Sequence, residues 1–277
     1  MAAASSVQIK KVACDVTFLF SRGMHSENQF ILVVFAYVEK AILSNTAHSC
    51  PLSVSSFEST EGFAGSAPLT ILEEIVAEDK RFCEEVGIHY HGRWLQKIME
   101  SGHSDLFWAA NDVDYFICEE DDQKFLNRVD TIIANLRIAI SRHGRDLKVA
   151  NPRSSACADP HRAVLIVDVQ ISGIPPTLSF VQAPFMENME NVLDSFDIDV
   201  VKVMYDPRTR CILTYNTVMT GVWHGEANVT KTFLASPGAP TKWEVSNYYS
   251  TLMRMVKYGK RGYKFLNYPK LIEATPV

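Results

Sequence analysis

The sequence lacks the patterns that mark several common classes of protein. No two of its six cysteines form a Cys-x-x-Cys pair, so zinc-ribbon and dithiol redox sites are not indicated. It has no glycine-rich Walker loop, no Gly-x-Ser-x-Gly nucleophile motif and no His-Glu-x-x-His helix. P-loop nucleotide hydrolysis, serine-hydrolase chemistry and zinc-protease chemistry are therefore without support in the sequence.

Long apolar runs and secretory signals are also scarce. The first six residues are small and uncharged, which is not typical of a secretory signal. The most apolar run, residues 30–38, is too short to span a bilayer, and we expect a buried helix or strand there. We therefore expect no membrane partner and an intracellular protein with reduced thiols, in the cytoplasm, or in a virion or the host cytoplasm if the source is viral.

Positive charge is in slight deficit. The net charge of −5 argues against a protein that coats nucleic acid without sequence preference. With 277 residues, of which 47% are hydrophobic, the chain has ample material for a core. We expect an N-terminal segment with an apolar helix and a loop at residues 1–68, and a main domain with a C-terminal helix at residues 69–277. The oligomeric state does not follow from the sequence.

The order of the predicted elements is typical of an α+β fold with a mixed sheet and flanking helices. We expect strands at 112–118, 163–171, 177–183, 196–205 and 211–214, and helices at 71–86, 94–99, 119–143, 187–195 and 243–258. Residues 44–68 and 145–161 are rich in small or polar residues and in proline, and are predicted to be loops. The short link with two prolines between 171 and 177 predicts a hairpin.

The run Asn111-Asp112-Val113-Asp114-Tyr115-Phe116-Ile117 predicts a strand with two carboxylates at its start. Side chains alternate along a strand, so Asp112 and Asp114 share one face while Val113, Tyr115 and Ile117 face a core. Two neighbouring acids repel unless a cation lies between them, and hard oxygen ligands suit a divalent metal. A second acidic run contains Asp197 and Asp199. If the two runs are neighbours in one sheet, three or four carboxylates converge.

Further motifs surround these acids. Gly102-His103-Ser104 forms a glycine turn ten residues before Asp112, and Arg254 to Tyr263 has the pattern Arg-x-x-Lys-Tyr-x-x-Arg-Gly. The order of glycine turn, paired acids, later acid and basic ending resembles the nucleotidyltransferase superfamily with its polymerase-beta-like fold. It is most similar to the divergent members found in large DNA viruses and some fungi. The resemblance covers residues 94–265, and implies a nucleotidyltransferase-like core.

The resemblance implies two-metal catalysis on a nucleoside triphosphate. Mg²⁺ or Mn²⁺ would be held by Asp112, Asp114 and Asp197, the same three residues being the catalytic ones. Gly102 and Ser104 would contact the β- and γ-phosphates, and Lys257 would clamp the triphosphate. The enzyme would transfer a nucleoside monophosphate to an acceptor that the sequence does not identify, whether protein, RNA or small molecule.

Other interpretations stay open. His103 departs from the family turn, which has Gly or Ser there, and this favours an inactive relative that serves as a structural or interaction protein, for instance in a virion. A third interpretation is a toxin-like enzyme that modifies a protein or transfer RNA. The acids themselves also fit a turn acid followed by a solvated edge acid, and the basic ending also fits the solvated end of a helix.

Overall fold

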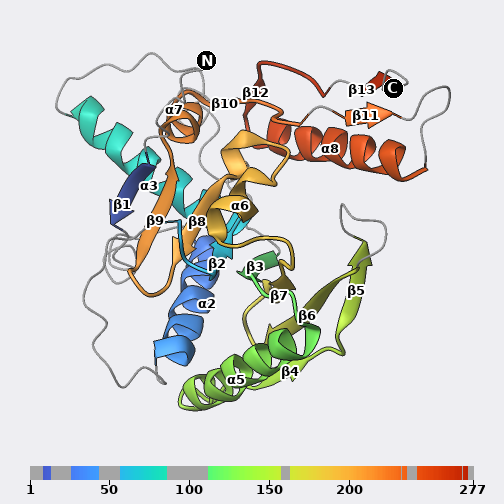
Figure 1. The fold of residues 1–277 in the computed structure, drawn as a ribbon. Coiled ribbons are helices and arrows are strands. Elements are labelled where there is room, and N and C mark those ends of the chain that lie inside the picture. The colour runs from blue at the N-terminus through green and yellow to red at the C-terminus, as the bar shows by residue number, and fades with distance from the viewer. Residues whose placement is uncertain are drawn as a thin grey trace.

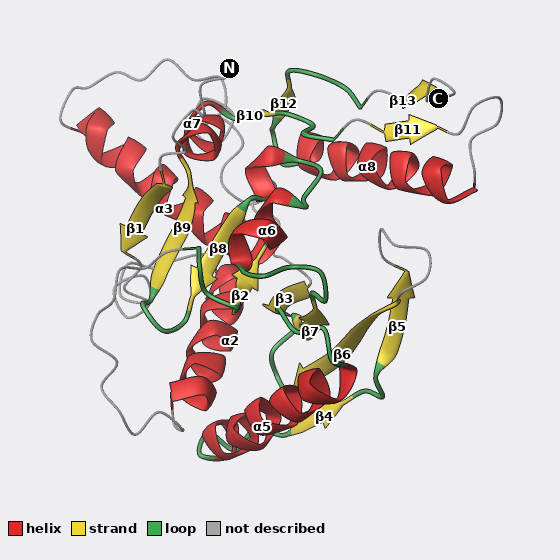
Figure 2. Ribbon diagram, viewed as in Figure 1, coloured by secondary structure: helices red, strands yellow, loops and turns green. Residues whose placement is uncertain are grey.

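The computed structural model describes residues 9–13, 26–43, 57–85, 112–156, 163–231, 233–235, 242–269 and 271–273. Within these ranges, nine strands form one mixed sheet (Figures 1 and 2). In spatial order they are β1 (Ile9–Ala13), β9 (Cys211–Tyr215), β8 (Val203–Asp206), β2 (Glu61–Ala64), β3 (Asp112–Ile117), β7 (Thr177–Gln182), β6 (Ala163–Ile171) and β4 (Leu147–Val149), with β5 (Arg153–Ala156) also paired to β6. The expected α+β fold with a mixed sheet and flanking helices is confirmed.

Helices flank this sheet, and two small sheets accompany the last of them. The helices are α2 (Ser26–Leu43), α3 (Ser66–Glu85), α5 (Asp122–Ser141), α6 (Met189–Asp194), α7 (Asn216–His224) and α8 (Lys242–Lys260), with a 3₁₀ turn at η1 (Asp199–Val201). The small sheets pair β10 (Glu226–Ala227) with β12 (Lys264–Phe265) and β11 (Phe233–Ala235) with β13 (Leu271–Glu273). In Figure 1, β3 and β7 lie between α8 above and α5 below.

The strand β3 occupies an interior position in the sheet. It pairs antiparallel with β2 on one side and parallel with β7 on the other. The strands β6 and β7 pair antiparallel, as the predicted hairpin requires. Because a parallel neighbour needs a crossover, the chain between β3 and β7 passes through α5 before it returns to the sheet.

One face of the sheet centre carries an aromatic core. The ring of Phe63 on β2 lies 4.9 Å from Tyr115 on β3 and 4.3 Å from Phe35 on α2. Phe35 also stacks on Tyr205 of β8, with ring centroids 4.6 Å apart. All four side chains are fully buried, so this aromatic cluster fixes α2 against three neighbouring strands.

The helix α5 follows its predicted pattern closely. It lies within the helix predicted at 119–143, and its buried residues recur at helical spacing, namely Phe125, Val129, Ile132, Ile133, Leu136 and Ile140. Asp121 caps its start, because the side chain accepts a hydrogen bond of 2.8 Å from the backbone N–H of Lys124. Asn135 donates to the carbonyl oxygen of Ala41 at 2.9 Å, which joins α5 to the end of α2.

Several predicted boundaries are wrong. The loop predicted at 145–161 contains β4 and β5, two short strands that pair with the long strand β6. The loop predicted at 44–68 contains β2, a wholly buried strand in which a Cβ on Gly62 would lie 3.1 Å from Met204. Propensity did not indicate these strands because their pairing partners lie far away in sequence.

The strand predicted at 196–205 is also shorter than expected. Only Val203–Asp206 is a strand, since Asp199 accepts hydrogen bonds from the backbone and side-chain amides of Asn228 at 2.7 and 2.9 Å. These contacts fix the start of the 3₁₀ turn η1, so a turn forms where a strand was expected. The helix α7 was not predicted, and the helix expected at 94–99 lies outside the described residues.

The N-terminal segment expected at 1–68 shares the sheet and core of the rest of the chain. It supplies β1, α2 and β2, and residue 68 falls inside α3. The apolar run at 30–38 lies within α2, where most of its side chains are buried, as expected. In the part of the chain that the structure describes, no helix is both long and apolar enough to cross a membrane.

A buried carboxylate ties α5 to the sheet. Glu61 on β2 is 5% exposed and pairs with Arg128 of α5 at 2.6 Å and with Arg208 of the β8–β9 turn at 2.7 Å. Burial acts to raise the pKa of Glu61, but the two guanidinium groups outweigh it and lower that pKa below its ordinary value. The ionised pair therefore contributes stability at neutral pH that is lost as the pH falls.

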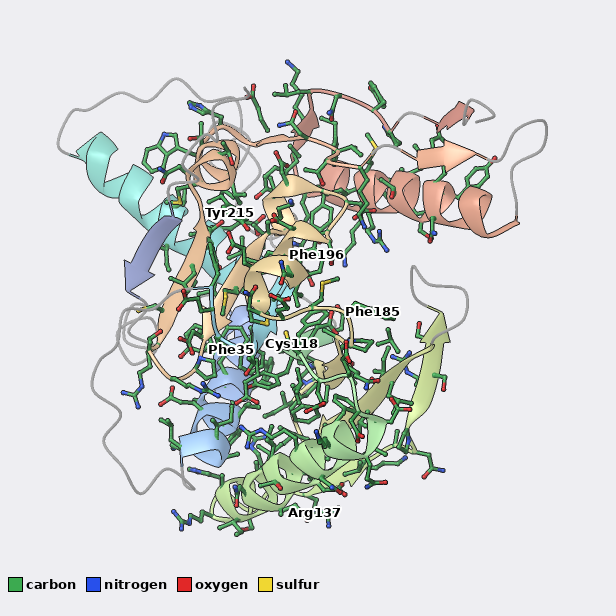
Figure 3. The ribbon with its side chains drawn as sticks, in the orientation of Figure 1. Phe35, Cys118, Arg137, Phe185, Phe196 and Tyr215 are labelled. Carbon is green, nitrogen blue, oxygen red and sulfur yellow. The ribbon has the colours of Figure 1, made fainter. Side chains whose placement is uncertain are left out.

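We expect Arg128→Met to lower the free energy of unfolding by about 1 to 3 kcal/mol at neutral pH, because Glu61 stays buried with one partner fewer. Arg137→Met is the matched control on the same helix, since Arg137 is exposed on its outer side (Figure 3). Urea unfolding of the three proteins measures the effect. The Arg128→Met deficit should shrink as the pH falls below 4.5, the ordinary value for Glu61; a deficit that does not change with pH contradicts this account.

Candidate functional site

The paired acids on β3 lie as the alternation predicts. Val113 and Tyr115 are fully buried and Ile117 is 5% exposed, while Asp112 is exposed and Asp114 half-buried on the opposite face. Asp112 and Asp114 therefore share one face of the sheet, away from the aromatic core. The predicted placement of these two carboxylates is confirmed.

A third carboxylate, Asp168, lies on the same face. In the parallel pairing of β3 with β7, Asp114 is opposite Ser179, and in the antiparallel pairing of β7 with β6, Asp168 is opposite Ser179. Residues opposite one another in neighbouring strands lie on the same face of a sheet. Asp114, Ser179 and Asp168 thus form one row across three strands, and Asp112 lies two residues from Asp114 along β3. The three carboxylates of Asp112, Asp114 and Asp168 are called the acid row below.

The surroundings of Asp114 disfavour the charged form of its carboxyl group. Burial and then the neighbouring Asp112 carboxylate raise the pKa of Asp114 to about 7, with Asp168 acting in the same direction. Lys257 and Arg153 act in the opposite direction, so two cations also lie within electrostatic range of Asp114. Three carboxylates on one face are suited to a cation that carries more charge than a lysine or an arginine, such as a divalent metal ion.

The helix α8 brings positive charge to these acids. Lys257 lowers the pKa of Asp114, as described above, and its Nζ lies 5.8 Å from the ring centre of Tyr258. Burial, opposed by Arg261 and assisted by Asp112, raises the pKa of Tyr258 to about 12. Lys257, in the last turn of α8, is therefore within electrostatic range of Asp114.

Asp197 has a different environment. Its carboxylate accepts hydrogen bonds from the Thr251 hydroxyl and from the guanidinium of Arg254, both on α8. Its backbone carbonyl accepts a bond of 2.9 Å from the amide of Thr230. Asp197 precedes η1 rather than lying on a strand, and β2 separates β8 from β3. The two acidic runs are therefore not neighbouring strands, and Asp197 anchors α8.

The remaining predicted site residues, Gly102 and Ser104, lie outside the described residues together with His103. Within the described ranges, no group of three histidine, cysteine or acidic side chains is placed to hold a metal ion as it stands. Two contacts account for part of this, because the carboxylate of Asp168 is engaged by Arg153 and by Ser179. The donor set itself, three carboxylates on one face, fits a hard divalent cation.

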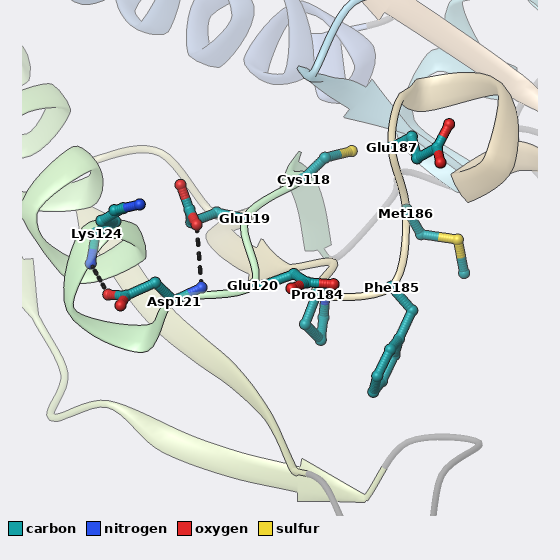
Figure 4. A pocket seen from close by; sticks show the side chains of 9 residues that line it. All are labelled: Cys118, Glu119, Glu120, Asp121, Lys124, Pro184, Phe185, Met186 and Glu187. Atoms are coloured by element: carbon teal, nitrogen blue, oxygen red, sulfur yellow. Dashed lines mark hydrogen bonds between the residues drawn. The ribbon is translucent and has the colours of Figure 1, made fainter.

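A separate cavity of about 520 Å³ lies at the other end of β3 (Figure 4). Its lining joins the segment after β3 to the segment after β7 and consists of Cys118, Glu119, Glu120, Asp121, Lys124, Pro184, Phe185, Met186 and Glu187. Burial raises the pKa of the Cys118 thiol to about 11, which keeps the thiol protonated and unreactive. Four acids against one lysine disfavour a triphosphate here, so the acid row is the better candidate for a nucleotide.

Comparison of the chain with protein-family models and with curated proteins finds no match in either. The assignment of a function therefore depends on the geometry of the site.

Three residues of the site were not predicted, namely Arg153, Asp168 and Ser179. Asp168 had a detectable signal, because it is the one charged residue in the otherwise apolar stretch from Ala163 to Val169. An acid in the middle of a strand with apolar neighbours is costly unless it has a partner or a function. Arg153 had no such signal, since it falls in a polar segment that was expected to be a loop.

We expect Asp114→Asn to change how the stability of the metal-free protein depends on pH. Because the pKa of Asp114 is raised to about 7 from an ordinary 3.8, the parent loses stability between these two values as the pH rises. The asparagine variant lacks this loss and should be about 1 to 3 kcal/mol more stable relative to the parent at pH 8 than at pH 4.

The measurement is urea unfolding at both pH values with a chelator present. Asp130→Asn, at an exposed position on α5, is the control for removal of one acidic group. If Asp114→Asn and Asp130→Asn shift stability equally at both pH values, the pKa of Asp114 is not raised in the folded protein.

Proposed function

We propose that this protein is a nucleotidyltransferase that transfers a nucleoside monophosphate from a nucleoside triphosphate to an acceptor. The observation that carries the proposal is the placement of Asp112, Asp114 and Asp168 on one sheet face, with Lys257 of α8 within electrostatic range of Asp114. The paired acids and the lysine agree with the nucleotidyltransferase resemblance of the sequence. The third acid is assigned to Asp168 on β6 in place of Asp197.

Each residue has a role that its environment supports. Asp112, Asp114 and Asp168 would hold Mg²⁺ or Mn²⁺. A divalent cation bound there would neutralise the triphosphate and activate the acceptor hydroxyl. Lys257 binds triphosphate oxygens, since its charge already acts on the acid row. Arg254 orients Lys257, because its ion pair with Asp197 fixes α8 one turn earlier.

The acceptor is a protein, an RNA or a small molecule. The transfer assay described below identifies both the acceptor and the preferred nucleotide. Gly102 and Ser104 are the expected contacts of the β- and γ-phosphates. An intracellular location, where nucleoside triphosphates and magnesium are abundant, belongs to the same proposal.

The two candidate third acids are distinguished by metal binding. We expect Mn²⁺ to stabilise the parent by about 1 to 3 kcal/mol at ten- to hundredfold excess over its Kd, because it binds only the folded state. Asp168→Asn should remove this stabilisation, as should Asp112→Asn combined with Asp114→Asn. Asp197→Asn should retain it although α8 is less firmly anchored. Thermal unfolding with and without Mn²⁺ gives the result, and loss of the effect only in Asp197→Asn restores the original assignment.

Binding of the nucleotide tests Lys257. Lys257→Ala should weaken binding of a labelled nucleoside triphosphate about ten- to hundredfold, the usual effect of losing one charged phosphate contact. Lys260→Ala is the matched control, because Lys260 is exposed on the same helix. Equal weakening by both substitutions indicates attraction by overall charge and contradicts a specific clamp.

Transfer itself is tested with α-labelled nucleoside triphosphates and acceptors of each class, using the parent and Asp112→Ala. Label transferred by the parent and not by the variant supports the enzyme. No transfer to any acceptor, combined with unchanged stability in Mn²⁺, supports the alternative of an inactive relative with a structural or interaction role.

A further inference from the structure

Arg153 holds the third carboxylate of the acid row. Its Nε donates to Oδ2 of Asp168 at 2.8 Å, and its Nη2 lies 3.4 Å from Oδ1. The Ser179 hydroxyl donates to Oδ1 at 2.7 Å. Both carboxylate oxygens of Asp168 are therefore engaged by side chains of the protein.

This ion pair is open to solvent and easily exchanged. The side chain of Arg153 is 53% exposed and that of Asp168 is 25% exposed. Arg153 lies on β5, which among the described strands pairs only with β6. An exposed ion pair contributes little to stability, so its replacement by another cation costs little. Ser179, which is 6% exposed, remains beside Asp168 after such an exchange.

The guanidinium of Arg153 thus offsets part of the negative charge of the three carboxylates through its ion pair with Asp168. A divalent ion carries twice the charge and is attracted to the same carboxylates, so the guanidinium and the metal compete for Asp168.

We infer that Arg153 is a resident counter-ion that a divalent cation must displace from Asp168. The inference rests on the proposed function, because it assumes that the acid row binds a metal. Arg153 is then a positioning residue: it holds Asp168 in place without metal and sets the concentration at which the metal binds.

The test is titration of the metal-free protein, residues 1–277, with Mn²⁺ alone, with free Mn²⁺ followed by electron paramagnetic resonance. Arg153→Gln should bind Mn²⁺ about two- to tenfold more tightly than the parent, the range expected from loss of an exposed ion pair. Arg153→Lys keeps the charge and should stay close to the parent. A purely structural role for Arg153 predicts weaker binding, because loss of β5 would loosen β6.

Arg145→Gln is the matched control for removal of one positive charge. Arg145 donates to the carbonyl oxygen of Ser172, at the turn of the β6–β7 hairpin. Its loss should leave Mn²⁺ affinity unchanged, and tightening equal to that of Arg153→Gln would show a general charge effect and overturn the inference.

The remaining outcomes separate this inference from the proposed function. If Mn²⁺ binds the parent and Arg153→Gln equally, and Asp112→Asn with Asp114→Asn abolishes binding, the function stands and the inference is wrong. If neither the parent nor Arg153→Gln binds Mn²⁺, the metal site and the inference are both wrong. Circular dichroism confirms folding of each variant, and if Arg153→Gln does not fold, Arg153→Ala replaces it with the same expected tightening.

Discussion

The register of three neighbouring strands is the constraint on which the site depends. The parallel pairing of β3 with β7 and the antiparallel pairing of β7 with β6 place Asp114, Ser179 and Asp168 in one row. A slip of one residue in either pairing would move one carboxylate to the aromatic core on the other face. The buried aromatic cluster around Tyr115 therefore does more than stabilise the fold, because it penalises a one-residue slip that would separate the acids.

A row of carboxylates needs compensation when no metal is bound, and the structure supplies it in three ways. A proton is available to Asp114, whose pKa is about 7; Lys257 approaches from α8; and Arg153 pairs with Asp168 from β5. The proton, Lys257 and Arg153 come from different parts of the protein or from solvent, and none is held in a buried ion pair. By contrast, the central Glu61 is buried with two arginines, which suits a permanent structural role. The difference in burial separates an acid that holds the fold together from acids that remain available to a ligand.

The sequence predicted the parts of this arrangement that depend on local pattern. Alternation along β3 predicted the shared face of Asp112 and Asp114, the sequence pattern predicted a helix where α5 lies, and the proline-rich link predicted the β6–β7 hairpin. Long-range pairing was not predictable in this way. The strands β2 and β5 have weak local signals and are strands because β3, β8 and β6 pair with them. Arg153 was missed for that reason, since only its pairing with β6 brings it to Asp168.

Asp197 shows why order along the chain is weaker evidence than position in the sheet. It has the residue type and the place in sequence that the third acid of a nucleotidyltransferase requires, but it lies before η1 and pairs with Arg254. Through Thr251 and Arg254 it fixes the middle of α8, and the same helix carries Lys257 toward Asp114 one turn later. Asp197 therefore acts on the acid row through the helix that it anchors. Asp197 is only 8% exposed and is already neutralised by a guanidinium, so its release for a metal is expensive; Asp168 is 25% exposed, so its pair with Arg153 is easier to exchange.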